Sequence, residues 1–201
     1  MATLTLNPTV NGDVYAYEGS WPLTGAATKG LGSTKYAFGA GYNGAQYYLY
    51  NMLLRFDTSS LPDTAIISSA KLRLYWSSRS VAAGSHTLSG EYFDCGAAVD
   101  TTDCTITTSS TAWTGVDPAN FVPGGTPGYY EFTLLNPNTS ISKTGFTGFR
   151  THSNYSGTPT TNNLAEINLV ADANKPELVI TYTVPTNISA MTGMSGLSGM
   201  N

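Results

Sequence analysis

The feature that most constrains this chain is a run of short segments in which apolar and polar residues alternate. Clusters of Gly, Pro, Asn and Ser separate these segments, and such alternation is typical of strands with one buried face. No window keeps the apolar stripe of a long helix. The sequence therefore predicts an all-β fold, an antiparallel β-sandwich of jelly-roll character. The predicted strands are 3–8, 13–19, 48–57, 70–78, 86–94, 104–109, 129–135, 144–152, 165–172 and 176–184.

Residues 51–76, NMLLRFDTSSLPDTAIISSAKLRLYW, show this alternation most clearly. Leu54 and Phe56 share one face of the first strand, while Arg55 and Asp57 share the other. Arg55 and Asp57 are therefore predicted to form a structural ion pair or to hold the loop that follows.

The second half of the same stretch predicts a loop and another core strand. Proline fixes the chain beside Leu61, and Ile66 is expected to plug the core. Alternation turns three residues inward: Leu72, Leu74 and Trp76. It turns three outward: Lys71, Arg73 and Tyr75.

Charge and hydropathy narrow the classes of partner. The net charge of −4 comes with no run of Lys or Arg, which argues against nucleic acid. No stretch approaches the ~18 apolar residues of a membrane span. The opening MATLTLNPTV lacks the basic and apolar regions of a signal peptide, so none is expected. Only 11% of residues are charged, which favours an extracellular or virion surface over a cytoplasmic enzyme.

Residues 53–76, together with the closing NKPELVITYTV at 174–184, resemble the DNRLRE-type domains. DVYAYEG is similar to the opening strand of that family, whereas TSSTAWTGVDP matches its middle only loosely. The resemblance implies a jelly-roll sandwich with a non-catalytic role, found in bacterial surface proteins and phage virions, with relatives that bind acidic polysaccharides such as alginate. The expected parts are an N-terminal arm (1–9), the sandwich (10–184) and a C-terminal arm (185–201).

The residues for catalysis are few, and we expect no enzyme. His86 and His152 are the only histidines, and neither has a neighbouring nucleophile motif such as G-x-S-x-G. The carboxylates are scattered, so no facing pair can be selected for glycosidase chemistry.

Residues 94–104, DCGAAVDTTDC, leave two questions open. Asp94, Asp100 and Asp103 supply oxygen ligands that suit calcium, although aspartates also stabilise turns without an ion. Asp13 with Glu18 is a weaker calcium candidate. Apart from calcium, no cofactor is expected. Cys95 and Cys104 form either a short-loop disulfide or two free thiols.

Aromatic residues in Gly-, Ser- and Thr-rich segments are candidates for a carbohydrate platform. They are Trp21, Tyr42, Trp113 and Tyr155. Exposed rings in loops can stack on sugars, but the same residues could instead cover the ends of the sandwich or line a protein interface. An acidic polysaccharide would also need nearby cations, and only Lys35 and Arg79 are remotely placed for this.

The chain closes with PTNISAMTGMSGLSGMN, in which apolar residues are separated by Gly and Ser. They are Met191, Met194, Leu197 and Met200. Such a segment cannot form its own core, so we expect an extended arm whose apolar side chains bind pockets of a neighbouring subunit. A short helix packed on the sandwich is the alternative.

These features together favour a non-catalytic structural protein of a virion surface. We expect a phage capsid decoration or fibre-type protein that binds neighbours such as the major capsid protein, as a homo-oligomer or bound to a lattice. The alternative is a carbohydrate-binding module for acidic polysaccharide. A polysaccharide-degrading enzyme is the least favoured class because no catalytic constellation is found.

Overall fold

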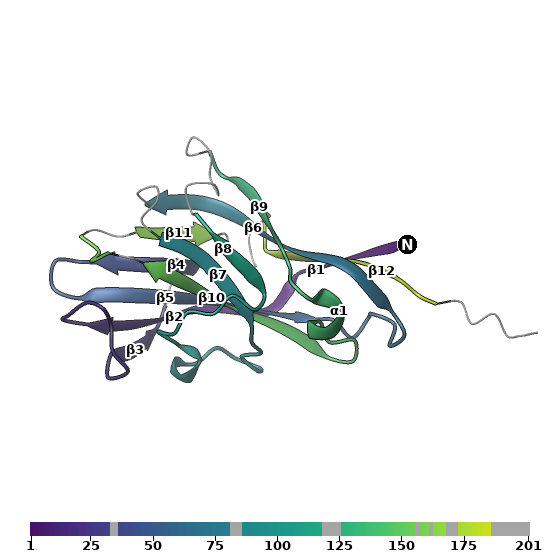
Figure 1. Ribbon diagram of the computed structural model, residues 1–201, viewed down its shortest axis with the longest axis horizontal. Coiled ribbons are helices and arrows are strands. Elements are labelled where there is room, and N and C mark those ends of the chain that lie inside the picture. Colours follow the sequence, from purple (N-terminus) through teal and green to yellow (C-terminus); the bar gives the residue numbers. More distant parts are fainter. Residues whose placement is uncertain are drawn as a thin grey trace, which may run out of the picture.

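The computed structural model describes residues 1–32, 36–80, 86–117, 126–155, 157–160, 163–167 and 173–185. The regular secondary structure of the described residues is nearly all β, arranged as two packed antiparallel sheets, which confirms the all-β sandwich (Figure 1). No helix in these ranges is long and apolar enough to cross a membrane.

The elements alternate with turns along the chain, as the sequence pattern predicts. The strands are β1 (Ala2–Leu6), β2 (Pro8–Glu18), β3 (Thr28–Leu31), β4 (Tyr36–Tyr42), β5 (Tyr47–Asp57), β6 (Ile66–Ser80), β7 (His86–Tyr92), β8 (Trp113–Val116), β9 (Gly128–Thr133), β10 (Phe146–Tyr155), β11 (Asn163–Ile167) and β12 (Glu177–Thr183). The helices are η1 (Thr101–Asp103) and α1 (Pro137–Ser140).

Strand β5 joins the two sheets. Its first half pairs with β4, and its second half pairs with β10, while β2 follows its other edge along its whole length. From β4 the hydrogen-bonded path continues through β11, β6 and β12 to β1, and from β10 it continues through β7 to β8. The sheets therefore diverge at the middle of β5, and β3 and β9 extend them through β2 and β6.

The main core fills the space between the sheets. Leu54 and Phe56 of β5 are fully buried in it, as are Leu72, Leu74 and Trp76 of β6, which confirms the alternation predicted for both strands. The inward side chains of β5 and β6 therefore form the centre of the core. Close packing of such aromatic and aliphatic side chains supplies most of the favourable energy of a sandwich.

A second, smaller core lies on the outer side of β2 and β5. Val14, Ala16 and Leu53 pack there against Cys95 and Cys104. The two cysteines belong to the loop that follows β7, so this loop covers a face of the sheet that would otherwise lie in solvent. The predicted strand 104–109 is wrong, because these residues are part of that covering loop.

The prediction for Ile66 was wrong by one position. Ile66 is 51% exposed, whereas Ile67 is 4% exposed and belongs to the core. A β-bulge in the β6–β12 pairing lies between Thr181 and Tyr182 and adds a residue, so Ile67 and Ala70 face inward although they are three apart. Counting by two from Leu72 therefore reaches the wrong face.

The terminal segments differ in how they relate to the sandwich. Residues 2–6, expected in an N-terminal arm, form β1 and pair with β12. The structure describes the chain only up to residue 185, so the predicted C-terminal arm with Met191, Met194, Leu197 and Met200 lies outside the described residues.

Candidate functional site

Four tyrosines lie side by side on one face of β2 and β5. Tyr15 pairs in register with Tyr50, and Tyr17 pairs with Tyr48. Because side chains alternate along a strand, all four point away from the face that carries the buried Leu49. Each of the four is partly exposed. We call Tyr15, Tyr17, Tyr48 and Tyr50 the tyrosine plateau.

The rings of the plateau form a continuous aromatic surface. Tyr17 and Tyr48 stack with ring centroids 5.6 Å apart at 26°. Tyr48 and Tyr50 stack at 6.0 Å and 21°. Tyr15 lies 5.5 Å from Tyr50 at a steeper angle of 44°. Separations and angles of this size are typical of offset-stacked and tilted aromatic pairs.

Glycines of the neighbouring strands leave room for these rings. Gly30 of β3 pairs with Tyr15, and a Cβ atom at Gly30 would lie 2.6 Å from Tyr15 Cζ. On the other side, Gly39 and Gly41 of β4 pair with Tyr50 and Tyr48. The ring of Tyr15 therefore lies over β3 at Gly30, in the space that a side chain at this position would fill.

Polar groups surround one side of the plateau. Asn43 Nδ2 donates to the Tyr48 hydroxyl at 2.9 Å, and this hydroxyl donates to Gln46 Oε1 at 3.2 Å. Burial, together with the charges of Tyr48, Asp13 and Tyr15, raises the pKa of Tyr50 to about 12. Tyr50 is therefore a neutral hydrogen-bonding group at ordinary pH, and the plateau can offer both aromatic faces and hydroxyls to a ligand.

The structure brings three of the four predicted carbohydrate residues together. Trp21 lies 6.0 Å from Tyr47 and 5.9 Å from Tyr155, and Tyr42 stacks on Tyr47 at 4.6 Å. Tyr47 was not among the predicted residues. We call Trp21, Tyr42, Tyr47 and Tyr155 the tryptophan group; each member is partly buried. It lies on the opposite face of β5 from the plateau, because Tyr47 and Tyr48 alternate.

The prediction for Trp113 as an exposed loop residue was wrong. Trp113 is 1% exposed, begins β8 and packs 4.9 Å from Phe132 in the main core. It pairs with Gly90, where a Cβ atom would lie 2.0 Å from the indole ring, so the missing side chain makes room for it. The side chains of Lys35 and Arg79, the cations considered for an acidic glycan, lie outside the described residues.

The sequence signal for the plateau was the repeated Tyr-x-Tyr pattern in VYAYE and YYLYN. Residues two apart on a strand share a face, so each pattern puts two rings together. The register between β2 and β5 then joins the two pairs, and this pairing could not be read from either segment alone.

The three aspartates considered for calcium act within turns. Asp94 binds Arg55 and accepts from Gly96 N at 2.9 Å. Asp100 accepts from Thr102 N, and Asp103 accepts from Asp100 N at 2.8 Å, which forms the cap of η1. Across the ranges given above, no group of three or more His, Cys, Asp or Glu side chains could hold a metal ion.

Arg55 is paired differently from the prediction. Its Nε lies 2.6 Å from Asp94 Oδ1, and its guanidinium lies over the ring of Phe146. Asp57 Oδ1 instead accepts from the backbone and hydroxyl of Ser59, and these hydrogen bonds hold the pKa of Asp57 below its usual range. The ion pair thus links β5 to the loop after β7. Because Arg55 and Asp94 lie far apart in the sequence, local spacing did not predict this pair.

Both cysteines are buried free thiols in the structure. Cys104 Sγ donates to Asn51 Oδ1 at 3.5 Å. Burial raises the pKa of Cys95 and of Cys104 to about 11. In this state the two thiols act as apolar members of the smaller core.

His152 is the buried member of a partly buried ion-pair cluster under the covering loop. It is 2% exposed, and its Nε2 lies 2.8 Å from Glu91 Oε1. Arg150 binds the same carboxylate oxygen through Nε at 2.6 Å and donates to the backbone oxygen of Asp103 at 2.7 Å. The cluster therefore holds the loop to β7 and β10, and the imidazole has no access to a ligand in solution.

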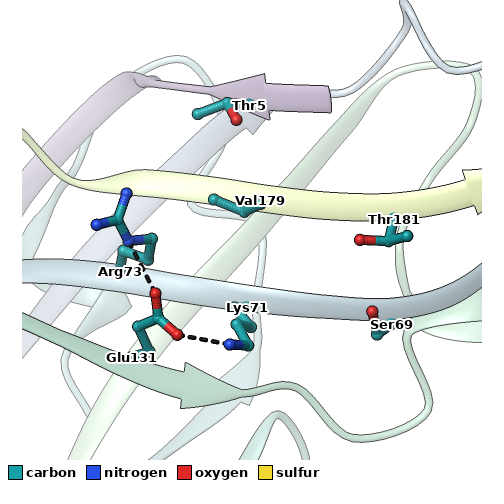
Figure 2. Close-up of a pocket in the computed structure, with 7 residues that line it drawn as sticks. All are labelled: Thr5, Ser69, Lys71, Arg73, Glu131, Val179 and Thr181. Carbon is teal, nitrogen blue, oxygen red and sulfur yellow. Dashed lines mark hydrogen bonds and ion pairs between the residues drawn. The ribbon is translucent and has the colours of Figure 1, made fainter. Parts of the chain in front are cut away.

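A groove of about 280 Å³ lies over β1, β12, β6 and β9 (Figure 2). Glu131 binds Lys71 at 2.6 Å and Arg73 at 3.1 Å, and Arg73 also binds Glu177. The cations of the groove are thus matched by carboxylates. We interpret it as an ion-pair ladder across three strands and not as a site for an anion.

Comparison with protein-family models finds none that matches the chain, and a search of curated proteins finds no match. The resemblance to the DNRLRE-type domains stays a prediction from the residues quoted above.

Proposed function

We propose that the protein is a non-catalytic binding module that recognises a neutral glycan through the tyrosine plateau. The observation that carries this proposal is the set of four neighbouring, partly exposed rings on the face of β2 and β5 opposite the smaller core, two pairs of which are stacked at 26° and 21°. The flat C–H faces of pyranose rings stack on aromatic rings, and hydroxyls at the ring edges supply hydrogen bonds.

Charge distinguishes the proposed ligand from the acidic polysaccharide first expected. A uronate chain requires cations that are available to its carboxylates. Arg55, Arg73 and Arg150 all bind carboxylates of the protein itself. Lys29 points to the other side of β3 and donates to Cys104 O. Asp13 adds a negative charge next to the plateau, which favours a neutral ligand over an anionic one.

Tyr47 and Tyr48 offer a matched pair of variants to test this function. They are neighbours in sequence, but Tyr48 belongs to the plateau and Tyr47 to the tryptophan group. Affinity electrophoresis in gels with neutral β-linked polysaccharides and with alginate would reveal the ligand class. We expect Tyr48→Ala to weaken binding of a neutral chain by at least about tenfold, or about 1.4 kcal/mol, and Tyr47→Ala to change it little.

Three outcomes would contradict the proposal. Binding that fails with Tyr47→Ala and survives with Tyr48→Ala would move the site to the tryptophan group. Preference for alginate would reverse the ligand class. Absence of binding to every polysaccharide, including a broad glycan array, would exclude glycan recognition by this chain.

A second candidate function is that of a structural protein of a virion surface. Its support is the composition of residues 186–201, where Met and Leu recur among Gly and Ser directly after the last strand of the sandwich. A chain with these side chains suits insertion into apolar pockets of a neighbour such as a capsid protein. The two functions are compatible, because the arm and the plateau use different parts of the chain.

Co-sedimentation with particles that lack the protein would test the virion role. Full-length protein is expected to bind the particles, and deletion of 186–201 is expected to abolish binding while leaving the sandwich folded. Equal binding by both forms would contradict a role of the arm, and binding by neither would contradict the virion partner.

A further inference from the structure

The turn between β4 and β5 places Asn43 next to Gly44, the dipeptide step most prone to deamidation because glycine leaves its own backbone nitrogen unhindered. We propose that Asn43 is a self-modification site, at which the folded protein promotes its own deamidation to aspartate and isoaspartate. Residues 43–45 are exposed, so water reaches the turn.

Three hydrogen bonds of the Asn43 amide match what this reaction needs. Oδ1 accepts from Ala45 N at 3.0 Å and from Gln46 N at 2.9 Å. Nδ2 donates to the Tyr48 hydroxyl at 2.9 Å. Two backbone donors thus surround the oxygen on which negative charge develops, and a hydroxyl lies beside the leaving nitrogen.

The steps balance without an oxidant or reductant. The backbone nitrogen of Gly44 loses its proton to solvent and forms a bond to Asn43 Cγ, which moves an electron pair onto Oδ1. The two N–H groups stabilise this oxyanion. The Tyr48 hydroxyl, which accepts from Nδ2 and donates to Gln46 Oε1 before the reaction, then turns its proton toward the leaving nitrogen. The C–Nδ2 bond breaks, ammonia leaves with this proton, and solvent replaces it on Tyr48. Water opens the succinimide at either carbonyl, so that one water is consumed and one ammonia released overall.

The chain contains an internal control with the same two residues. Asn11 and Gly12 lie within β2 and pair with Leu54 and Leu53. A Cβ atom at Gly12 would lie 3.1 Å from Val99 Cγ2, so the covering loop packs against this step. Sequence alone gives Asn11 and Asn43 the same reactivity, whereas the structure separates a paired strand from an exposed turn with an assembled hydrogen-bond set.

The modification would act on the candidate binding site. It replaces the Nδ2 donor that holds Tyr48 with a carboxylate, and the isoaspartate product also lengthens the turn by one backbone atom. This consequence rests on the proposed glycan function, whereas the modification itself does not. Tyr48 is a member of the plateau, so a change in its support should reduce ligand affinity in aged protein.

Peptide mapping by mass spectrometry after incubation of the full chain at pH 8 tests the proposal. We expect the peptide with Asn43 to convert at least about tenfold faster than the peptide with Asn11 in folded protein, and the two rates to become similar in urea, where local structure is lost. An intact Asn43, or equal rates in the folded protein, would overturn the proposal.

The variant Tyr48→Phe tests the assigned proton donor, with Tyr50→Phe as its control on the same strand face. Loss of the hydroxyl should slow conversion of Asn43 by at least about tenfold, while Tyr50→Phe should leave the rate unchanged. Circular dichroism would verify that both variants are folded. An unchanged rate in Tyr48→Phe would overturn the role of Tyr48. Because mapping needs no glycan, this result is independent of whether the plateau binds one.

Discussion

Asn51 Nδ2 donates to the backbone oxygen of Thr151 at 2.9 Å, at the point where β5 leaves β10 and continues beside β4. Thr151 makes a second hydrogen bond to β5, because its Oγ1 accepts from Met52 N at 2.7 Å. Asn51 Oδ1 accepts from Thr105 N of the covering loop at 2.9 Å. Asn51 is completely buried, and it therefore joins both sheets and the loop with all its hydrogen bonds inside the protein.

Replacement of Asn51 by leucine should destabilise the sandwich strongly. The change removes these partners from the partly buried Thr105 N–H and the buried Thr151 carbonyl, which costs about 2–4 kcal/mol of unfolding free energy. Urea denaturation followed by fluorescence would measure the loss. The control Thr9→Val removes an exposed hydrogen bond to Arg55 O and should cost less than about 0.5 kcal/mol. Equal stability of Asn51→Leu and the parent would contradict the role of this junction.

The sequence predicted the fold class and most long strands because apolar and polar residues alternate along these strands. Leu54 and Phe56 face the core as expected, and so does Trp76. Strand β4 was not predicted, since its glycines are typical of turns, yet two of those glycines pair with plateau tyrosines. The prediction for Ile66 failed for another reason. The β-bulge in the β6–β12 pairing changes which residues of β6 face inward, and this bulge depends on the partner strand.

Contacts between distant segments were the part that sequence could not predict. Arg55 binds Asp94, which β7 brings next to it through the Phe93–Gly148 backbone contact, and not the nearby Asp57. Local spacing predicted which aromatic residues share a strand face, but strand register decides which of them meet. The plateau and the tryptophan group are both products of that register.

The partly buried cluster around His152 should make stability fall as the pH is lowered. Burial lowers the pKa of His152 below 6.5 and outweighs the neighbouring Glu91. Below pH 6.5 His152 therefore becomes protonated in the unfolded chain but stays neutral in the folded chain. The unfolding free energy decreases as the pH falls from 6.5 to the pKa of His152 in the folded protein. The variant His152→Gln should lose this dependence just below pH 6.5. An identical profile in parent and His152→Gln would contradict the assignment.

A second loss of stability is expected at lower pH from Glu91. Burial acts to raise its pKa, but the hydrogen bond from Arg150 and the neighbouring His152 outweigh this and hold the pKa below 4.5. This stabilisation is present above pH 4.5 and is lost as the pH falls through the folded pKa. Denaturation of Glu91→Gln across this range should show a smaller slope than the parent, and an equal slope would contradict the assignment.

Cys95 and Cys104 should react slowly with thiol reagents while the protein is folded. Both are buried, and burial raises both pKa values to about 11. At pH 8 the reactive thiolate is then scarce, so labelling should be at least about a hundredfold slower than in urea. Two thiols labelled in urea without a reducing agent would agree with the structure. Rapid labelling of folded protein would contradict the burial of the smaller core, and no labelling in urea would reveal a disulfide.

The last prediction links the glycine under the plateau to binding. Gly30→Ala would put a Cβ atom 2.6 Å from Tyr15 Cζ, so the ring must lift from its position across β3. Because the ring is the far end of a flexible side chain, the unfolding free energy should fall by less than about 1.5 kcal/mol. Affinity for the neutral glycan should fall several-fold, because a lifted ring interrupts the surface that stacks on it. Gly128→Ala meets no atom within 4 Å and is the control, with unchanged affinity expected. Full affinity in Gly30→Ala, measured by the same electrophoresis, would mean that Tyr15 lies outside the binding surface and that the ligand contacts Tyr17, Tyr48 and Tyr50 alone.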